Sequence, residues 1–337
     1  MAKAPVQKAK TAKKSAAGKT STQGKSSVKA PAAKSAAGPK KTSGKFQAAS
    51  LPTRLASGVP AVLAVAALLA WAPLDLGKLV VLVLAVWGAH EYQQMMAGRG
   101  LELPRWFFLG GAALMGLGGM AWGWLGLAGL LFIAIHMMMT PILLSVKDRN
   151  EVKRRWKVGW LGLILVPFAI NHLSLVLGYV PPLGPTASGE LLPTDGTQAS
   201  IETGRWALAF LVAVISLSDT LAYFTGILIG KTPLMPSVSP KKTVEGSLGG
   251  IAGGVLAAVG FQAMGWVTPG FEGAMALVAG GAFSLLGQAG DLTESKIKRF
   301  CGVKDSGRFL PGHGGVLDRL DAYLLAAPAY AWWLLMA

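Results

Sequence analysis

Long apolar segments follow one another along most of the chain. Beyond residue 50, about nine runs of near 20 residues are dominated by apolar side chains, and about 20 residues are enough for a helix to cross about 30 Å of hydrocarbon. Only a short turn rich in Gly and Trp separates the third run from the fourth. We expect membrane-spanning helices near residues 55–73, 76–96, 104–122, 125–145, 158–178, 206–229, 246–267, 271–290 and 315–336.

This pattern predicts an all-α polytopic integral membrane protein. The composition agrees, since 52% of the residues are hydrophobic and only 14% are charged, which is unusually apolar for a soluble domain. We expect N-terminal transmembrane helices over residues 51–200 and a catalytic transmembrane region over residues 201–337.

The N-terminal segment, residues 1–50, has a different composition. It is rich in Lys, Ala, Ser, Gly, Pro and Thr and cannot bury enough apolar surface to order itself. Of the 32 Lys and Arg residues, 13 precede the first acid, Asp75, so the remaining 19 nearly balance the 16 acids. We expect a disordered basic tail in the cytoplasm. It either touches anionic lipid, at roughly 1 kcal/mol for each Lys near the surface, or is a solvated tail without a specific role.

The other basic clusters lie in loops that this topology places on the same side as the tail. They cover residues 147–157, 231–242 and 296–308, so the positive-inside rule is satisfied. The segment 179–203, which has acids but no Lys or Arg, falls on the opposite side, as does the C-terminus.

The stretch 287–321 concentrates charge between two apolar segments. Asp291 follows a predicted spanning helix, and Asp318 and Asp321 are spaced to share one helical face. Such carboxylates suit Mg²⁺, which takes a few protein oxygens together with water and phosphate. A single Cys and four scattered His residues provide no zinc-binding spacing.

Basic side chains in the same stretch suit phosphate groups. Lys298, Arg299, Lys304 and Arg308 would meet phosphate charge, Arg through a bidentate fork and Lys as a point charge. The Pro and Gly residues around His313 suit a tight turn. The alternative reading is a solvated connecting loop.

Two upstream segments add candidate residues. Asp219 lies inside an apolar span, where an ionisable group is expensive and usually functional; alternatively, it pairs with a buried cation to fix helix packing. In the segment 239–250, Lys241 and Lys242 precede the expected start of a helix, whose free amides favour phosphate. Thr243 can instead act as a simple helix cap.

Residues 295–321 carry a resemblance to a known family. The segments SDTLAYFTG, SPKKTVEG and GQAGDLTES precede them in the family's order. The chain resembles the phosphatidate cytidylyltransferases, also called CDP-diacylglycerol synthases, over roughly residues 50 to 337. The specified positions of the family's C-terminal pattern are filled by Ser295, Ile297, Lys298, Arg299, Lys304, Asp305, Gly307, Leu310, Pro311, His313, Gly314, Gly315, Val316, Asp318, Arg319, Leu320 and Asp321.

The resemblance implies a Mg²⁺-dependent reaction in which the phosphate of phosphatidate attacks the α-phosphorus of CTP and expels pyrophosphate. It implies that Asp291 and Asp318 anchor the metal, and it leaves room for a second cation. Catalytic roles fall on Lys298, Arg299, Lys304, Asp305, His313, Arg319, Asp321 and Asp219. Substrate binding falls on Ser239, Lys241, Lys242, Thr243 and Ser295.

The expected partners are CTP, phosphatidate and the lipid bilayer, with a homodimer left open and no nucleic acid. The expected location is the bacterial inner membrane, with the active site facing the cytoplasm. A CTP-dependent polyprenol kinase and a secondary transporter are the alternatives. The complete C-terminal pattern disfavours the kinase, and a loop rich in cations disfavours the transporter.

Overall fold

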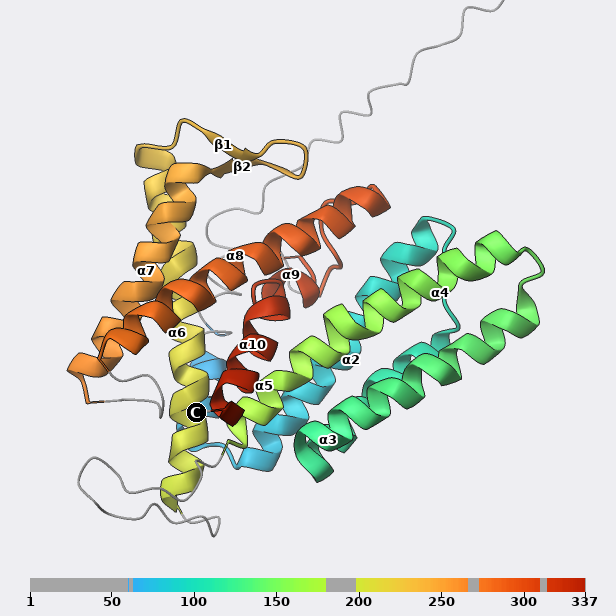
Figure 1. The fold of residues 1–337 in the computed structure, drawn as a ribbon, viewed down its shortest axis with the longest axis horizontal. Coiled ribbons are helices and arrows are strands. Elements are labelled where there is room, and N and C mark those ends of the chain that lie inside the picture. The colour runs from blue at the N-terminus through green and yellow to red at the C-terminus, as the bar shows by residue number, and fades with distance from the viewer. Residues whose placement is uncertain (1–59, 61–62, 180–197, 266–272, 310–313, 337) are drawn as a thin grey trace, which may run out of the picture. The chain divides into compact units, whose positions relative to one another are not determined.

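The computed structural model describes residues 60, 63–179, 198–265, 273–309 and 314–336. This part of the chain is helical apart from one short hairpin (Figure 1). The tail over residues 1–50, most of the segment 179–203 and His313 lie outside it. The elements are a helix over 63–71, then α2 (Leu74–Gly98), α3 (Arg105–Ser145), α4 (Arg149–Leu163), the π-helical turn η1 (Ile164–Phe168), α5 (Ala169–Leu177), α6 (Gln198–Leu228), β1 (Pro233–Met235), β2 (Ser239–Thr243), α7 (Val244–Ala263), α8 (Ala274–Cys301), α9 (Leu317–Leu320) and α10 (Tyr323–Met336).

Five of the described helical segments are long and apolar enough to cross a membrane. Large apolar side chains on them face outward, and Leu144 and Leu228 are 84% and 77% exposed, as expected where lipid replaces water. The prediction of a polytopic helical membrane protein is confirmed, whereas the number of about nine spans stays a prediction. The five segments are Arg105–Ser145, Arg149–Leu177, Thr203–Leu228, Val244–Ala263 and Ala274–Cys301.

The long helix α3 is two antiparallel halves joined by a sharp turn. Trp122 and Gly123 have non-helical dihedral angles, and Gly123 has a φ of 59°, a left-handed value that glycine adopts at little cost. The halves pack closely because a Cβ on Gly118 would lie only 2.9 Å from the carbonyl oxygen of Gly126. The expected break between residues 122 and 125 is therefore present.

Helices α6, α7 and α8 pack through small residues. A Cβ on Gly253 of α7 would lie 2.6 Å from the carbonyl oxygen of Leu217 on α6, so the two backbones are nearly in contact. The Ser218 and Ser284 hydroxyls hydrogen-bond at 2.7 Å, and Ser284 also donates to the Gly250 carbonyl at 2.9 Å. These contacts hold α6, which carries Asp219, and α8, which carries Asp291, against α7.

The hairpin β1–β2 connects α6 to α7 (Figure 1). The sequence pattern did not predict strands here, although it did place the start of a helix after Thr243. Helix α7 begins at Val244, and the Thr243 hydroxyl accepts a hydrogen bond from the Gly246 amide at 3.1 Å. The capping reading of Thr243 is thus correct. The Glu245 carboxylate accepts from the amides of Lys231 and Thr232, which ties the start of the hairpin to α7.

Candidate active site

The segment after α8 folds back against the end of that helix. Gly302, with a φ of 73°, ends α8 in the left-handed conformation. Asp318 in α9 then reaches Lys298 in α8, with 2.6 Å between the ammonium nitrogen and Oδ1. The two ends of the predicted motif therefore meet through a direct ion pair.

Lys298 is buried between two carboxylates. Its side chain is 11% exposed and contacts Glu294, which is 0% exposed, as well as Asp318, which is 7% exposed. A buried ion pair is stabilising only when its partners are well satisfied. The Lys298 ammonium is thus already paired with two acids of the protein. The sequence had suggested instead that it would meet the phosphate of a ligand.

Asp318 is held by hydrogen bonds on both oxygens. Lys298 reaches Oδ1, and Oδ2 accepts from the amides of Ser306 and Gly315, each at 2.8 Å. Burial acts to raise the pKa of the Asp318 carboxyl, but these donors outweigh it and hold the pKa below its usual value. Asp318 is therefore ionised at neutral pH.

Asp291 occupies a more open position. It forms an ion pair with Lys242 of β2, and the two side chains are 29% and 30% exposed. The Ser295 hydroxyl donates to Asp291 Oδ1 at 3.3 Å. This pair joins the SPKKT segment to α8 across 49 positions of sequence, so the two motifs contribute to one site.

The carboxylates of Asp219, Asp291 and Asp321 lie close enough together to repel one another. Burial, the charge of Asp291 and, to a smaller extent, the charge of Asp219 together raise the pKa of Asp321 to about 7. Asp219 is exposed on α6, so acids from α6, α8 and the turn after α9 gather at one place. Even so, the described residues include no group of three or more His, Cys, Asp or Glu side chains arranged to hold a metal ion.

The donor set still fits a hard cation in its chemistry. Every candidate ligand is a carboxylate oxygen, which Mg²⁺ prefers, and Mg²⁺ needs only one or two of them. Asp291 is reachable, whereas both oxygens of Asp318 already accept bonds from the protein. Ammonium groups at Asp291 and Asp318 show that each carboxylate lies where a positive charge is favourable.

Comparison with known proteins places these residues in a family. Residues 52–337 match the cytidylyltransferase family. The chain belongs to the cytidylyltransferase family. A phosphatidate cytidylyltransferase of Brucella abortus is 37% identical over 216 residues, which cover 61% of this chain and 69% of that protein.

Two further relatives match over shorter lengths. A phosphatidate cytidylyltransferase of Helicobacter pylori is 49% identical over 126 residues, covering 37% of this chain and 45% of that protein. An uncharacterized protein of Escherichia coli K12, YnbB, is 33% identical over 204 residues, covering 60% of each chain. The family match includes every element described above.

In this cytidylyltransferase, Arg299 has a structural contact that sequence reasoning missed. Its Nε donates to the Val238 carbonyl in the hairpin turn, and its Nη1 donates to the Val303 carbonyl, each at 3.2 Å. Arg299 therefore ties the hairpin and the segment after α8 to the end of α8. Two of its donor groups are used on the backbone rather than aimed at a phosphate.

The remaining predicted residues lie around this centre with different exposure. Ser239 is half-buried in β2, and Ser295 is buried on α8. The exposed ones are Lys241, Lys304, Asp305 and Arg319.

Three polar residues of the site were not among the predicted ones. Glu294 and Ser306 flank the Lys298–Asp318 pair, and Glu91 of α2 contacts the same loop through Ser306. Glu91 is a carboxylate inside a largely apolar segment, the same signal that marked Asp219. The spacing along the chain could not show that a residue more than 200 positions earlier reaches the motif.

Proposed function

We propose that the chain is a phosphatidate cytidylyltransferase. A phosphate oxygen of phosphatidate attacks the α-phosphorus of CTP, the bond from that phosphorus to the β-phosphate oxygen breaks, and CDP-diacylglycerol and pyrophosphate are formed. The observation that carries the proposal is the joining of the SPKKT segment to the C-terminal motif through Lys242 and Asp291. This contact joins the basic strand β2 to the acidic end of α8 in a chain that belongs to the cytidylyltransferase family.

The protein's part in this reaction is positioning and charge neutralisation. Two anionic reactants must approach one another, and such transfers need no side-chain nucleophile. Lys241, which is exposed, and Lys242 lie in β2 just before the start of α7 and would offset phosphate charge. Arg299 holds the hairpin that carries these lysines against α8. The lysines and Asp291 therefore keep fixed positions relative to one another.

Asp291 and Asp318 would hold Mg²⁺, which supplies positive charge to phosphate oxygens. Asp291 suits this role because it is partly exposed, and its described partners are the half-buried Lys242 ammonium and the Ser295 hydroxyl. Asp318 would hold an ion that exchanges more slowly, because the oxygens of Asp318 already accept bonds within the protein. A second cation would be drawn to the charge that Asp219 and Asp321 add to that of Asp291.

The membrane arrangement follows from the same assignment. About nine spanning helices, with the basic clusters and the site on the cytoplasmic side of a bacterial inner membrane, would let phosphatidate keep its acyl chains in the bilayer while its phosphate meets CTP. The division into a tail over 1–50, helices over 51–200 and a catalytic region over 201–337 belongs to this proposal. A homodimer would be detected by light scattering of the detergent complex.

Purified protein in detergent, supplied with CTP, Mg²⁺ and phosphatidate, tests the function. We expect lipid-dependent release of pyrophosphate and formation of CDP-diacylglycerol. A CTP-dependent lipid kinase would instead release CDP and phosphorylate a polyprenol. Absence of lipid-dependent pyrophosphate in protein that remains folded would reject the proposal.

A further inference from the structure

Glu91 is a buried carboxylate with a complete set of hydrogen-bond donors. It is 3% exposed on α2. Its Oε1 accepts from the Val316 amide and its Oε2 accepts from the Leu317 amide, both at 2.9 Å. Placing an ionisable side chain in an apolar span costs about 2.5–3.5 kcal/mol on insertion scales. An apolar residue would avoid that cost but would leave the Val316 and Leu317 amides without their acceptor, so the carboxylate is what fastens the loop to α2.

Ser306 connects Glu91 to the centre of the site. Its hydroxyl oxygen lies 2.9 Å from Glu91 Oε2 and 3.0 Å from Asp318 Oδ2. One hydroxyl has a single proton, so Ser306 donates to one carboxylate at a time while accepting from the Asp318 amide at 3.3 Å. This arrangement fixes the distance between the two acids.

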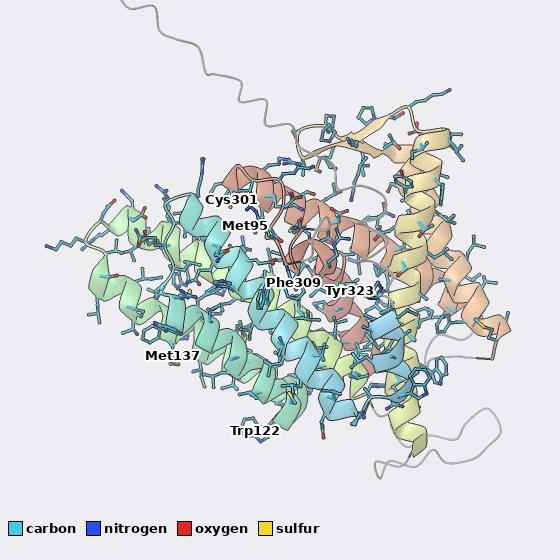
Figure 2. All side chains as sticks on the ribbon, turned by 180° about the vertical axis from the view of Figure 1, so that it is seen from behind. Met95, Trp122, Met137, Cys301, Phe309 and Tyr323 are labelled. Carbon is cyan, nitrogen blue, oxygen red and sulfur yellow. The ribbon has the colours of Figure 1, made fainter. Side chains whose placement is uncertain are left out.

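The surrounding residues are shaped to this contact. A Cβ on Gly315 would lie 2.6 Å from the Glu91 carboxyl carbon, and one on Gly307 would lie 2.7 Å from it, so only glycine lets the loop approach. One helical turn before Glu91, Trp87 packs against Phe309 of the same loop, with ring centroids 5.0 Å apart; Phe309 is labelled in Figure 2. Helix α2 therefore contacts the loop at two points on one face, through Glu91 and through Trp87.

We propose that Glu91 is a positioning residue for the transfer reaction, acting through Ser306 on Asp318 and through Asp318 on the Lys298 ammonium. The contacts form an unbroken series from α2 to α8, ending at the 2.6 Å pair of Lys298 and Asp318. Partners that orient a site's ligands typically change metal affinity or activity by about 10- to 100-fold when they are removed. A residue of the N-terminal helices thus belongs to the reaction centre.

This inference rests on the proposed function, and two substitutions test it. In Glu91→Gln, one carboxylate oxygen becomes an NH₂ group, so no orientation of the amide can accept from both Val316 and Leu317. Ser306→Ala keeps those two bonds and removes the hydroxyl that lies between Glu91 and Asp318 and that accepts from the Asp318 amide. Gln93→Met is the matched control. It lies two residues along α2, is also buried, and loses its 3.0 Å hydrogen bond to the Leu103 carbonyl without touching the loop.

The measurements are kcat, the Mg²⁺ concentration that gives half-maximal activity, and the affinity for Mn²⁺ determined by electron paramagnetic resonance. A loss of folded protein lowers the apparent kcat but leaves the two metal values unchanged. We expect both substitutions to lower kcat and to weaken both metal values by about 10-fold or more. The double variant should be no worse than the more damaged single variant, and Gln93→Met should keep wild-type metal values.

Two results would overturn the inference: Ser306→Ala with all three values within twofold of wild type, or losses in the double variant equal to the product of the single losses. If Glu91→Gln does not fold, Ser306→Ala alone decides. Wild-type protein that forms no CDP-diacylglycerol would instead reject the proposed function, and that outcome is seen before any variant is compared.

Discussion

Replacing Lys298 should destabilise the fold far more than replacing the other lysine paired to an acid in the site. In Lys298→Met, Glu294 and Asp318 lose their shared cation, and their side chains are only 0% and 7% exposed. Removing one partner of a buried ion pair costs about 3–5 kcal/mol, because the remaining charge has neither water nor a counter-ion.

Lys242→Met is the matched comparison. It also removes a lysine bound to an aspartate, but Lys242 and Asp291 are 30% and 29% exposed, so water can replace the lost partner. Exposed ion pairs contribute about 0.2–1 kcal/mol. The structure therefore predicts a difference of about 2–5 kcal/mol between the two variants.

The assay is reversible unfolding in mixed micelles with increasing dodecyl sulfate, followed by circular dichroism. Glu294→Gln in the Lys298→Met background removes one of the two buried carboxyl groups that lost their cation and should recover at least about 1 kcal/mol of the loss in unfolding free energy. The reasoning is wrong if Lys298→Met is no less stable than Lys242→Met, or if the double variant is as unstable as Lys298→Met alone.

Three other outcomes follow from the described contacts. Asp291→Asn should abolish detectable turnover in the pyrophosphate assay while lowering unfolding free energy by less than about 1 kcal/mol, because the pair that it breaks is partly exposed. Gly254→Val should cost about 1–3 kcal/mol by overpacking, since even a Cβ there lies 2.6 Å from the Ser284 Cβ across the α7–α8 contact. Deletion of residues 1–45 should leave most of the transfer activity, because the family match begins at residue 52.

Each of these outcomes has its own control. Gly260→Val, where a Cβ meets nothing within 4 Å, should be nearly neutral, so equal losses at both glycines would contradict the packing explanation. Normal turnover of Asp291→Asn would reject its part in metal binding. Loss of activity on deletion of the tail, in protein that unfolds at the same denaturant concentration, would assign the tail a role in the reaction.

Local patterns predicted the helices better than they predicted the contacts of charged residues. The length of an apolar segment relates directly to the thickness of hydrocarbon that it can cross, so α3, α6 and α7 were expected near their observed positions. The expected end of α8 at residue 290 was wrong, because the helix continues through the charged residues from Asp291 to Cys301. A threonine before an apolar run is a local signal as well, and Thr243 caps α7 as expected. The strands β1 and β2 were not expected, since the five residues of β2 include Pro and two Lys.

The sequence by itself determined a helical membrane protein with acids and bases gathered in its C-terminal third, because hydropathy and motif spacing are properties of neighbouring residues. Only the tertiary structure decided which charges meet. It buried Lys298 between Glu294 and Asp318, turned Arg299 toward backbone carbonyls, and brought Glu91 to Ser306 across 215 positions of sequence. Such pairings depend on helix packing through small residues such as Gly253, and hydrogen bonds act over about 3 Å regardless of distance along the chain.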